Sequence, residues 1–156
     1  MTVWTAAVGG VRWAASKRLV LRLSAAAIVV LQFAALAQAA SRGIDYLLLP
    51  GDAPTAASLA TVEKILTLNT SGWIFLLGAV FGFAGMLTRK IPLAAFSHSI
   101  LATCYAIFAA GSLIEVYTRS GELFGWRTGT GWIAAAVSHL VFAVASEYGW
   151  RMDRAD

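Results

Sequence analysis

The fold is decided by residues 65–114, which read ILTLNTSGWIFLLGAVFGFAGMLTRKIPLAAFSHSILATCYAIFAAGSLI. Two runs of 24 residues without Asp, Glu, Lys or Arg flank the basic pair Arg89-Lys90. A helix rises about 1.5 Å per residue, so about 20 apolar residues cross the ~30 Å hydrocarbon layer of a bilayer. Each run is therefore long enough to span a membrane. The short basic connection predicts that the two helices form an antiparallel hairpin.

Two further uncharged runs of 19 residues cover 23–41 and 128–146. The whole chain of 156 residues is 59% hydrophobic and only 13% charged, whereas soluble chains are about one quarter charged. Backbone polar groups in hydrocarbon need internal partners, and the alternation required by a barrel is absent, so the spans must be helices. The sequence predicts an all-α integral membrane four-helix bundle in one domain, 1–156. The spans are expected at about 20–41, 70–88, 91–115 and 130–148.

Positive charges are distributed unevenly among the segments that connect the spans. Eight of the twelve Lys and Arg residues lie in the N-terminal segment, the 89–90 connection and the C-terminal tail. The other two loops hold four of them, together with five of the eight acidic residues. This asymmetry predicts an up-down-up-down protein of the cytoplasmic membrane with both termini in the cytoplasm. The net charge of +4 does not form one patch, which argues against nucleic acid as a partner.

The first span has a second interpretation. Lys17-Arg18, a following apolar stretch and Ala37-Gln38-Ala39 are typical of a secretory signal with a small-residue cleavage site. The apolar stretch and the segment before it are both long for a signal, which favours an uncleaved span. Cleavage after Ala39 would instead leave three spans and an N-terminus outside the cell.

The longest hydrophilic stretch is the outer loop 42–69. Its residues 50–54 read PGDAP, a composition typical of a turn. From about Thr55 onward, Leu59, Val62 and Leu66 recur at helical spacing. We expect a short amphipathic helix that lies on the outer surface or leads into the second span.

Small residues at helical spacing mark the second run, most clearly Gly78, Gly82 and Gly85. Lipid is as apolar as leucine, so helices in a bilayer associate by close packing at small residues. This pattern predicts helix packing within the chain. The alternative is a surface for a homo-oligomer or for another membrane protein.

His98 and His139 are the two histidines, and both fall inside predicted spans. Counted from the cytoplasmic ends, both lie roughly 10–12 Å deep, so they can face each other. Ionisable groups at this depth are candidates for function. The pair could hold a b-type haem or relay protons, whereas a metal site would lack a third ligand because Cys104 lies about 9 Å away along the helix. The alternative is that each ring bonds a neighbouring serine or a carbonyl and stabilises packing. Gln32 is a further buried polar candidate.

The sequence contains no nucleophile–base pair, phosphate loop or cysteine cluster, which argues against an enzyme. Its size, four spans, short loops and Ala/Arg-rich composition resemble the small holin-like membrane proteins of actinobacteriophages and actinobacteria. The nine Arg against three Lys also suit a high-GC genome. The resemblance implies self-assembly in the bilayer and permeabilisation of the membrane. The tail 151–156 departs from that family, where strongly basic tails are common, because it is mixed in charge.

Two other functions fit the same layout. The chain could be an accessory or anchor subunit of a membrane complex, with haem b on His98 and His139. It could also be an exclusion or immunity factor that blocks another agent in the membrane. All three hypotheses expect lipid contacts and a partner that is either a second copy or another membrane protein.

Overall fold

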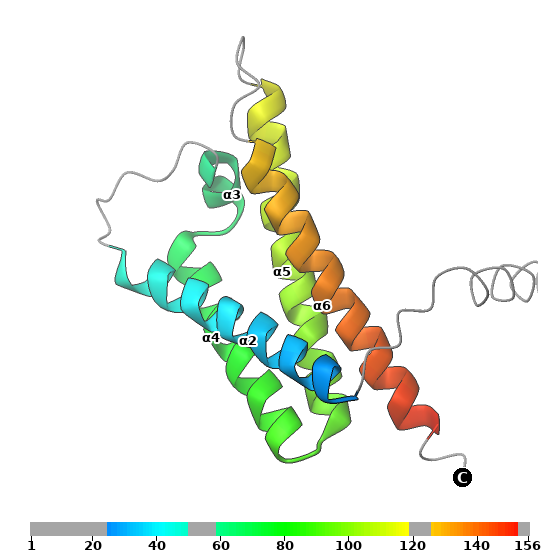
Figure 1. The fold of residues 1–156 in the computed structure, drawn as a ribbon. Coiled ribbons are helices and arrows are strands. Elements are labelled where there is room, and N and C mark those ends of the chain that lie inside the picture. The colour runs from blue at the N-terminus through cyan, green and yellow to red at the C-terminus, as the bar shows by residue number, and fades with distance from the viewer. Residues whose placement is uncertain (1–24, 50–58, 119–125, 153–156) are drawn as a thin grey trace, which may run out of the picture. The chain divides into compact units, whose positions relative to one another are not determined.

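The computed structural model describes residues 25–49, 59–118 and 126–152, and within these ranges every regular element is a helix. Figure 1 shows the helices α2, α3, α4, α5 and α6. The predicted all-α class is confirmed. The expected turn at 50–54 and the basic residues of the N-terminal segment lie outside the described residues. The helices begin and end as follows: α2 Ala25–Leu48, α3 Ala60–Ile65, α4 Leu68–Leu87, α5 Ile91–Thr118 and α6 Trp126–Met152.

Four of these helices are long and apolar enough to cross a membrane, which indicates a multi-pass integral membrane protein. Contacts within the chain define two compact units, residues 1–31 and residues 32–156. The described residues of the first unit, 25–31, are helical. All contacts discussed below lie within the second unit. The candidate spans are Ala26–Leu48, Leu68–Leu87, Ile91–Thr118 and Arg127–Glu147.

Helix α2 extends seven residues past the predicted end of the first span at Ser41. The sequence places Arg42 in the outer loop because the uncharged run stops there. In the structure this arginine is part of the helix, and its guanidinium carbon lies 4.0 Å from the centre of the Trp132 ring. A cation over an indole face is a favourable contact, which lets the helix continue through a charged residue.

The short helix α3 occupies the region where the sequence predicts an amphipathic helix. Its Val62 is fully buried, and a Cβ added at Gly111 of α5 would lie 2.5 Å from Val62 Cγ2. The Thr61 hydroxyl donates a hydrogen bond to the Glu115 carboxylate of α5. The apolar side of α3 is therefore packed on α5 of the same chain, while Lys64 on its other side is exposed.

The turn between α4 and α5 is closed by backbone hydrogen bonds. The Lys90 amide donates to the Gly85 carbonyl at 2.8 Å, and the Arg89 amide donates to the Met86 carbonyl at 3.2 Å. This is the Schellman pattern, in which the residue after the helix adopts the left-handed conformation. Arg89 has a φ of 57°, a conformation that favours glycine. Pro92 fits the first turn of α5 because amides there need no intrahelical partner.

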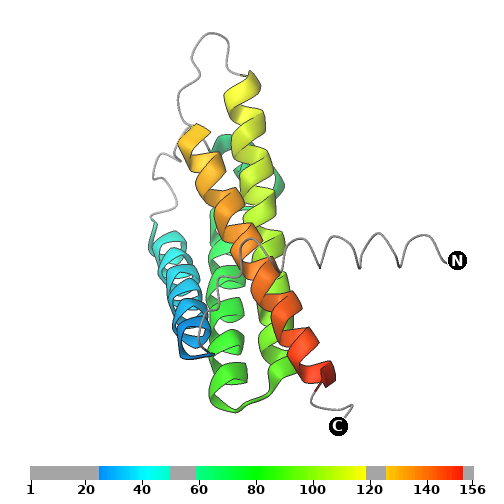
Figure 2. The same ribbon diagram turned by 45° about the vertical axis from the view of Figure 1, so that its right-hand side comes forward.

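Helices α4 and α5 approach closely through the small residues that the sequence singled out. A Cβ added at Gly78 would lie 2.8 Å from Leu101 Cδ2, and one at Gly85 would lie 2.6 Å from the Ala94 amide nitrogen. The buried Ser97 hydroxyl donates a 2.6 Å hydrogen bond to the Gly78 carbonyl. The glycine face of α4 is thus filled by side chains and backbone of the same chain, and Figure 2 shows the two helices side by side.

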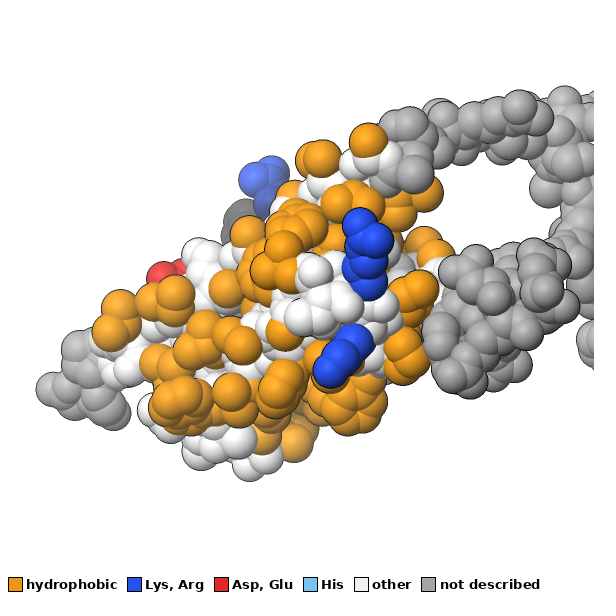
Figure 3. Space-filling model, turned by 90° about the horizontal axis from the view of Figure 1, so that it is seen from below, with side chains coloured by type: hydrophobic (Ala, Val, Ile, Leu, Met, Phe, Trp, Pro, Cys, Tyr) orange, Lys and Arg blue, Asp and Glu red, His pale blue; other side chains and the backbone are white. Residues whose placement is uncertain are grey.

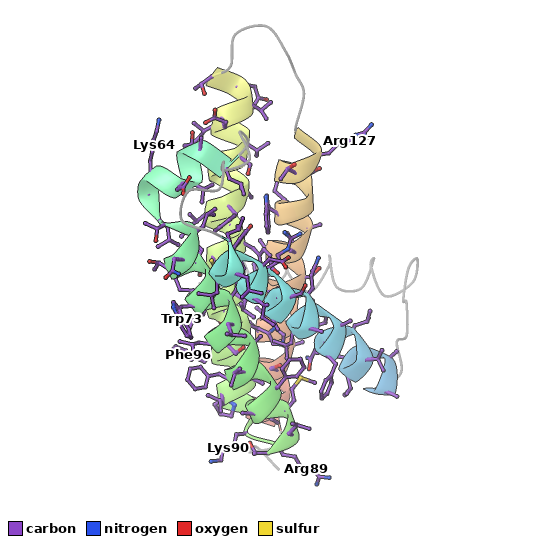
Figure 4. All side chains as sticks on the ribbon, turned by 90° about the vertical axis from the view of Figure 1, so that its left-hand side faces the viewer. Lys64, Trp73, Arg89, Lys90, Phe96 and Arg127 are labelled. Carbon is purple, nitrogen blue, oxygen red and sulfur yellow. The ribbon has the colours of Figure 1, made fainter. Side chains whose placement is uncertain are left out.

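The exterior of the bundle is apolar along the helices and basic near their ends. Figure 4 shows Trp73 and Phe96 on the outer side of α4 and α5, where they are 51% and 60% exposed. Arg89 and Lys90 lie at one end of this view, opposite Lys64 and Arg127. Seen from below in Figure 3, the surface is mostly hydrophobic with a few Lys and Arg side chains. Large exposed apolar side chains fit a surrounding solvent of lipid.

Candidate functional site: a buried histidine pair

The histidines of α5 and α6 meet inside the bundle. His98 is fully buried and His139 is 1% exposed. Their Nδ1 atoms lie 2.8 Å apart, which is a hydrogen-bond distance. The two helices lie side by side in Figures 1 and 2, so one ring from each helix can reach the seam between them. The sequence predicted two histidines at one depth, and the structure places them in direct contact.

Aromatic rings enclose the pair on both sides. Tyr105 stacks on His139 with ring centres 5.3 Å apart and an angle of 17° between the planes. Phe142 lies against His98 with its ring centre at 5.4 Å. Tyr105 is seven residues beyond His98, two helical turns along the same face of α5. The seam therefore holds both imidazoles in a dry, tightly packed environment.

The contact fixes how protons are distributed over the pair. A neutral imidazole carries one N–H donor and one bare nitrogen acceptor. A hydrogen bond between two Nδ1 atoms needs one ring protonated at Nδ1 and the other bare there, hence protonated at Nε2. The neutral pair must therefore contain two different tautomers, with one Nε2–H and one bare Nε2 at its ends. Both Nε2 atoms are buried, and neither has a hydrogen-bond partner among the described residues.

The neighbouring serines do not serve as partners of the histidines in the hydrogen bonds that we find. Ser97 donates to the Gly78 carbonyl, Ser99 to the Ala95 carbonyl and Ser138 to the Ala134 carbonyl. Each hydroxyl thus bonds backbone. The alternative interpretation, in which each imidazole bonds a local serine, is not the arrangement observed.

The geometry does not fit haem b between the two histidines. Axial ligands lie on opposite faces of the macrocycle, so the iron must sit between the two coordinating nitrogens. Here the rings touch through Nδ1, with centres 5.0 Å apart, and this contact closes the gap that a macrocycle needs. Across residues 25–49, 59–118 and 126–152, no three His, Cys, Asp or Glu side chains gather as a metal site would require. Cys104 is buried as a free thiol.

Next to the histidine pair lies a row of side chains that each carry a polar atom. The sequence analysis did not predict this row. The centres of the Tyr105 and Trp132 rings lie 5.6 Å apart. The Arg42 guanidinium lies over the same Trp132 ring. A signal was present in the spacing, because Trp132 precedes His139 by the same seven residues that separate His98 from Tyr105. Arg42 could not be assigned, since its helix was expected to end before it. Gln32, the other polar candidate, is half-buried on α2.

Comparison with known proteins adds no functional information. No protein-family model, curated protein or solved structure matches this chain. The interpretation of the site therefore depends on its own geometry, and above all on the direct contact between His98 and His139.

Proposed function

We propose that this chain is a non-enzymatic protein of the cytoplasmic membrane that relays protons through the His98–His139 pair. The observation that carries the proposal is the 2.8 Å Nδ1–Nδ1 contact between two buried imidazoles on adjacent candidate spans. Ionisable side chains at such depth are costly and usually serve transport of protons or ions. An imidazole is suited to this role because it can accept a proton at one ring nitrogen and donate one from the other.

The relay follows from the two tautomers. A proton binds the bare Nε2 of the ring that donates through Nδ1. That ring passes its Nδ1 proton across the hydrogen bond to Nδ1 of the second ring. The second ring then releases its Nε2 proton, so one proton enters and one leaves. The tautomers are exchanged at the end, so both rings must turn over before a second proton can follow in the same direction.

An up-down-up-down arrangement with both termini in the cytoplasm is part of the proposal. Contacts between α2 and α4 support it, because residue numbers rise along one helix as they fall along the other. A Cβ at Gly82 would meet Leu36, whereas Gly72 lies against Gly43. The charge asymmetry of the loops supports the orientation.

Proton transport in liposomes tests the relay. Purified protein is reconstituted, a potassium diffusion potential is imposed and internal pH is followed with a trapped dye. We expect proton uptake above that of protein-free liposomes, reduced to the protein-free level in His98→Ala and in His139→Ala. Ser138→Ala is the matched control. Ser138 is an exposed neighbour of His139, and the hydrogen bond that we find for its hydroxyl is to the Ala134 carbonyl of the same helix. Equal uptake by the wild type and both histidine variants would refute the relay.

Lateral assembly is a second candidate, and one observation favours it. Helix α5 presents exposed small residues at i, i+4, i+7 and i+11. Hollows of about 300 Å³ and about 260 Å³ flank this stripe on the outer side of the bundle. Close approach of helices at small residues is how membrane helices associate. The stripe consists of Ser99, Thr103, Ala106 and Ala110.

A holin-like role would use this outward stripe, because Gly78 and Gly82 are filled by the chain's own Leu101, Leu36 and Ser97. Replacing Ala106 with Leu should reduce crosslinking between copies and delay any collapse of membrane potential on induced expression. Replacing Val141, which is exposed on α6 and lines neither hollow, with Leu is the control. Unchanged crosslinking in Ala106→Leu would remove this candidate. An exclusion or accessory role stays a prediction that depends on a partner protein.

A further inference from the structure

Seven buried side-chain polar atoms lack a hydrogen-bond partner within the described part of the chain, and two of them are the Nε2 atoms of the histidine pair. Native interiors pair nearly all such atoms with protein or with ordered water, so a cluster of exceptions points to something that pairs them. The other five are Arg42 Nε, Ser71 Oγ, Tyr105 Oη, Ser112 Oγ and Trp132 Nε1.

All five lie on the same side of the pair. On α5, Tyr105 and Ser112 are seven and fourteen residues beyond His98, so Ser112 is about 21 Å farther along the helix. On α6, which returns in the opposite direction, Trp132 precedes His139 by seven residues. Toward the other end of the bundle, the buried Ser97 is paired with the Gly78 carbonyl. The unpaired atoms therefore lie on one side of the histidine pair, whereas Ser97 beside the pair, in the α4–α5 contact, is paired.

Four of these side chains, from His139 to Arg42, form a continuous series of contacts. His139 stacks on Tyr105, Tyr105 lies 5.6 Å from Trp132, and the Arg42 guanidinium lies 4.0 Å from the Trp132 ring. Each member carries a buried polar atom outside the hydrogen bonds that we find, and Arg42 lies close enough to Tyr105 to interact with it. Water is small enough to pair such atoms and to connect them, and buried waters typically make about three hydrogen bonds.

We propose that this row is a hydrated path by which protons reach His98 and His139 from the end of the bundle where α5 ends and α6 begins. The path rests on the proposed proton relay, but it is a separate claim about access of water. The path gives the pair access from that end of the bundle, and passage across the membrane needs a separate exit toward the α4–α5 turn. The occupant is water carrying a proton.

Charged and titratable groups around the path shape its selectivity. From α2, Arg42 sets a fixed positive charge beside it, and Tyr46 packs nearby against Phe108. From α5, Glu115 lies beyond Ser112 and accepts the Thr61 hydrogen bond. Helix α4 contains no charged residue or histidine along its length. A fixed cation in a narrow path opposes every cation, protons included, so Arg42 should slow silver and keep the rate of proton passage low.

Helix α3 covers the outer end of this path. Its Val62 fits against Gly111, the residue before Ser112, and Leu59 and Val62 belong to the same apolar cluster as Tyr46 and Trp132. Figure 1 shows α3 beside the C-terminal half of α5. Water reaching Ser112 must therefore pass the edge of this short helix.

Silver ion, a small probe that reacts with thiols, tests the path. Single cysteines replace Ser112, Ser71 or Ser97 in a Cys104→Ala background, and silver is added to right-side-out or inverted vesicles. All three serines are fully buried, so Ser97→Cys is a control matched in residue and burial. Unreacted thiols are counted with a fluorescent maleimide after unfolding. Thr118→Cys, exposed at the end of α5, reports the sidedness of each preparation.

We expect silver to block the thiols of Ser112→Cys and Ser71→Cys from the side that also blocks the thiol of Thr118→Cys. The thiol of Ser97→Cys should stay unreacted from both sides. Adding Arg42→Gln to Ser112→Cys should raise its rate of reaction about tenfold, because a fixed charge in a cleft changes local ion concentration by that order.

Three outcomes would each overturn the path. The first is an unreactive Ser112→Cys thiol in a preparation where Thr118→Cys reacts. The second is reaction of Ser97→Cys at a rate equal to that of Ser112→Cys. The third is reaction of Ser112→Cys from the opposite side of the membrane. The relay could still pass its own test in liposomes, so the two claims fail separately.

Discussion

Close helix contacts in this protein depend on single glycines. A Cβ added at Gly82 would lie 2.5 Å from Leu36 Cδ2 and 2.6 Å from Ser97 Oγ, so even one methyl group must displace both neighbours. Displacing Ser97 would also strain its hydrogen bond to the Gly78 carbonyl. At Gly131 of α6, by contrast, an added Cβ would meet no atom within 4 Å.

Gly82→Ala should therefore lower the free energy of unfolding in detergent by about 1–3 kcal/mol, the usual cost of overpacking. Gly131→Ala should be neutral or raise it by up to about 1 kcal/mol, since alanine favours a helix more than glycine does. Unfolding of both variants by a denaturing detergent, followed by circular dichroism, measures the difference. Equal stability of the two variants would mean that α2, α4 and α5 do not pack as described.

The left-handed Arg89 gives a second prediction at this scale. Its φ of 57° is strained for any residue with a Cβ, by about 1–2 kcal/mol. Arg89→Gly should relieve part of this strain and raise the melting temperature, whereas Arg89→Ala should not. A melting temperature raised equally by both would point to loss of charge and not to relief of the backbone.

At the scale of elements, α3 is held to α5 by few contacts. Val62 fits a notch at Gly111, and the Thr61 hydroxyl bonds the Glu115 carboxylate. A helix of six residues is too short to be stable alone, so its structure depends on this packing. A methyl group added at Gly111 should therefore weaken the packing of α3 on α5.

Gly111→Ala should loosen α3 and speed hydrogen exchange of its backbone amides by about tenfold or more, while exchange in α4 stays unchanged. Mass spectrometry of peptides covering 60–65 measures this, with Gly131→Ala as the control outside the notch. Unaltered exchange in 60–65 would show that Val62 does not hold the helix.

Sequence patterns predicted the long helices better than their ends or interior contacts. Uncharged runs located α4 and α5 within a few residues, because length and charge decide what crosses a bilayer. The end of α2 was wrong, since a charge was taken as a boundary although Arg42 finds an indole ring to cover. The depth of the histidines followed from residue counting, but the direct contact depends on helix rotation, which a pattern of small residues leaves open.

For the whole molecule, lipid as the solvent explains why polar groups face inward. Apolar side chains such as Phe96 and Leu87 are exposed, while His98, Ser97 and Ser112 are buried. The second unit therefore keeps its buried polar side chains between helices, and the two histidines lie in the seam of α5 and α6. The orientation predicted from basic residues is a separate property, set by insertion and not by packing.

Orientation can be measured with exposed cysteines in the Cys104→Ala background. Lys90 and Arg127, the positions to be replaced by cysteine, lie at opposite ends of the bundle in Figure 4. In intact cells, an impermeant maleimide should label Arg127→Cys and leave Lys90→Cys protected until the membrane is disrupted. Labelling of the Lys90→Cys variant in intact cells would reverse the proposed orientation, and with it the face from which protons reach the pair.

The most direct test of the account is the protonation state of the two imidazoles in a bilayer. Nitrogen-15 magnetic resonance of histidine-labelled protein distinguishes an Nδ1–H ring from an Nε2–H ring. At neutral charge we expect one ring of each kind, joined by a resolved coupling across the Nδ1–Nδ1 hydrogen bond, and loss of that coupling in His139→Ala. Two identical Nε2–H rings without coupling would contradict the shared hydrogen bond and the proton relay built on it.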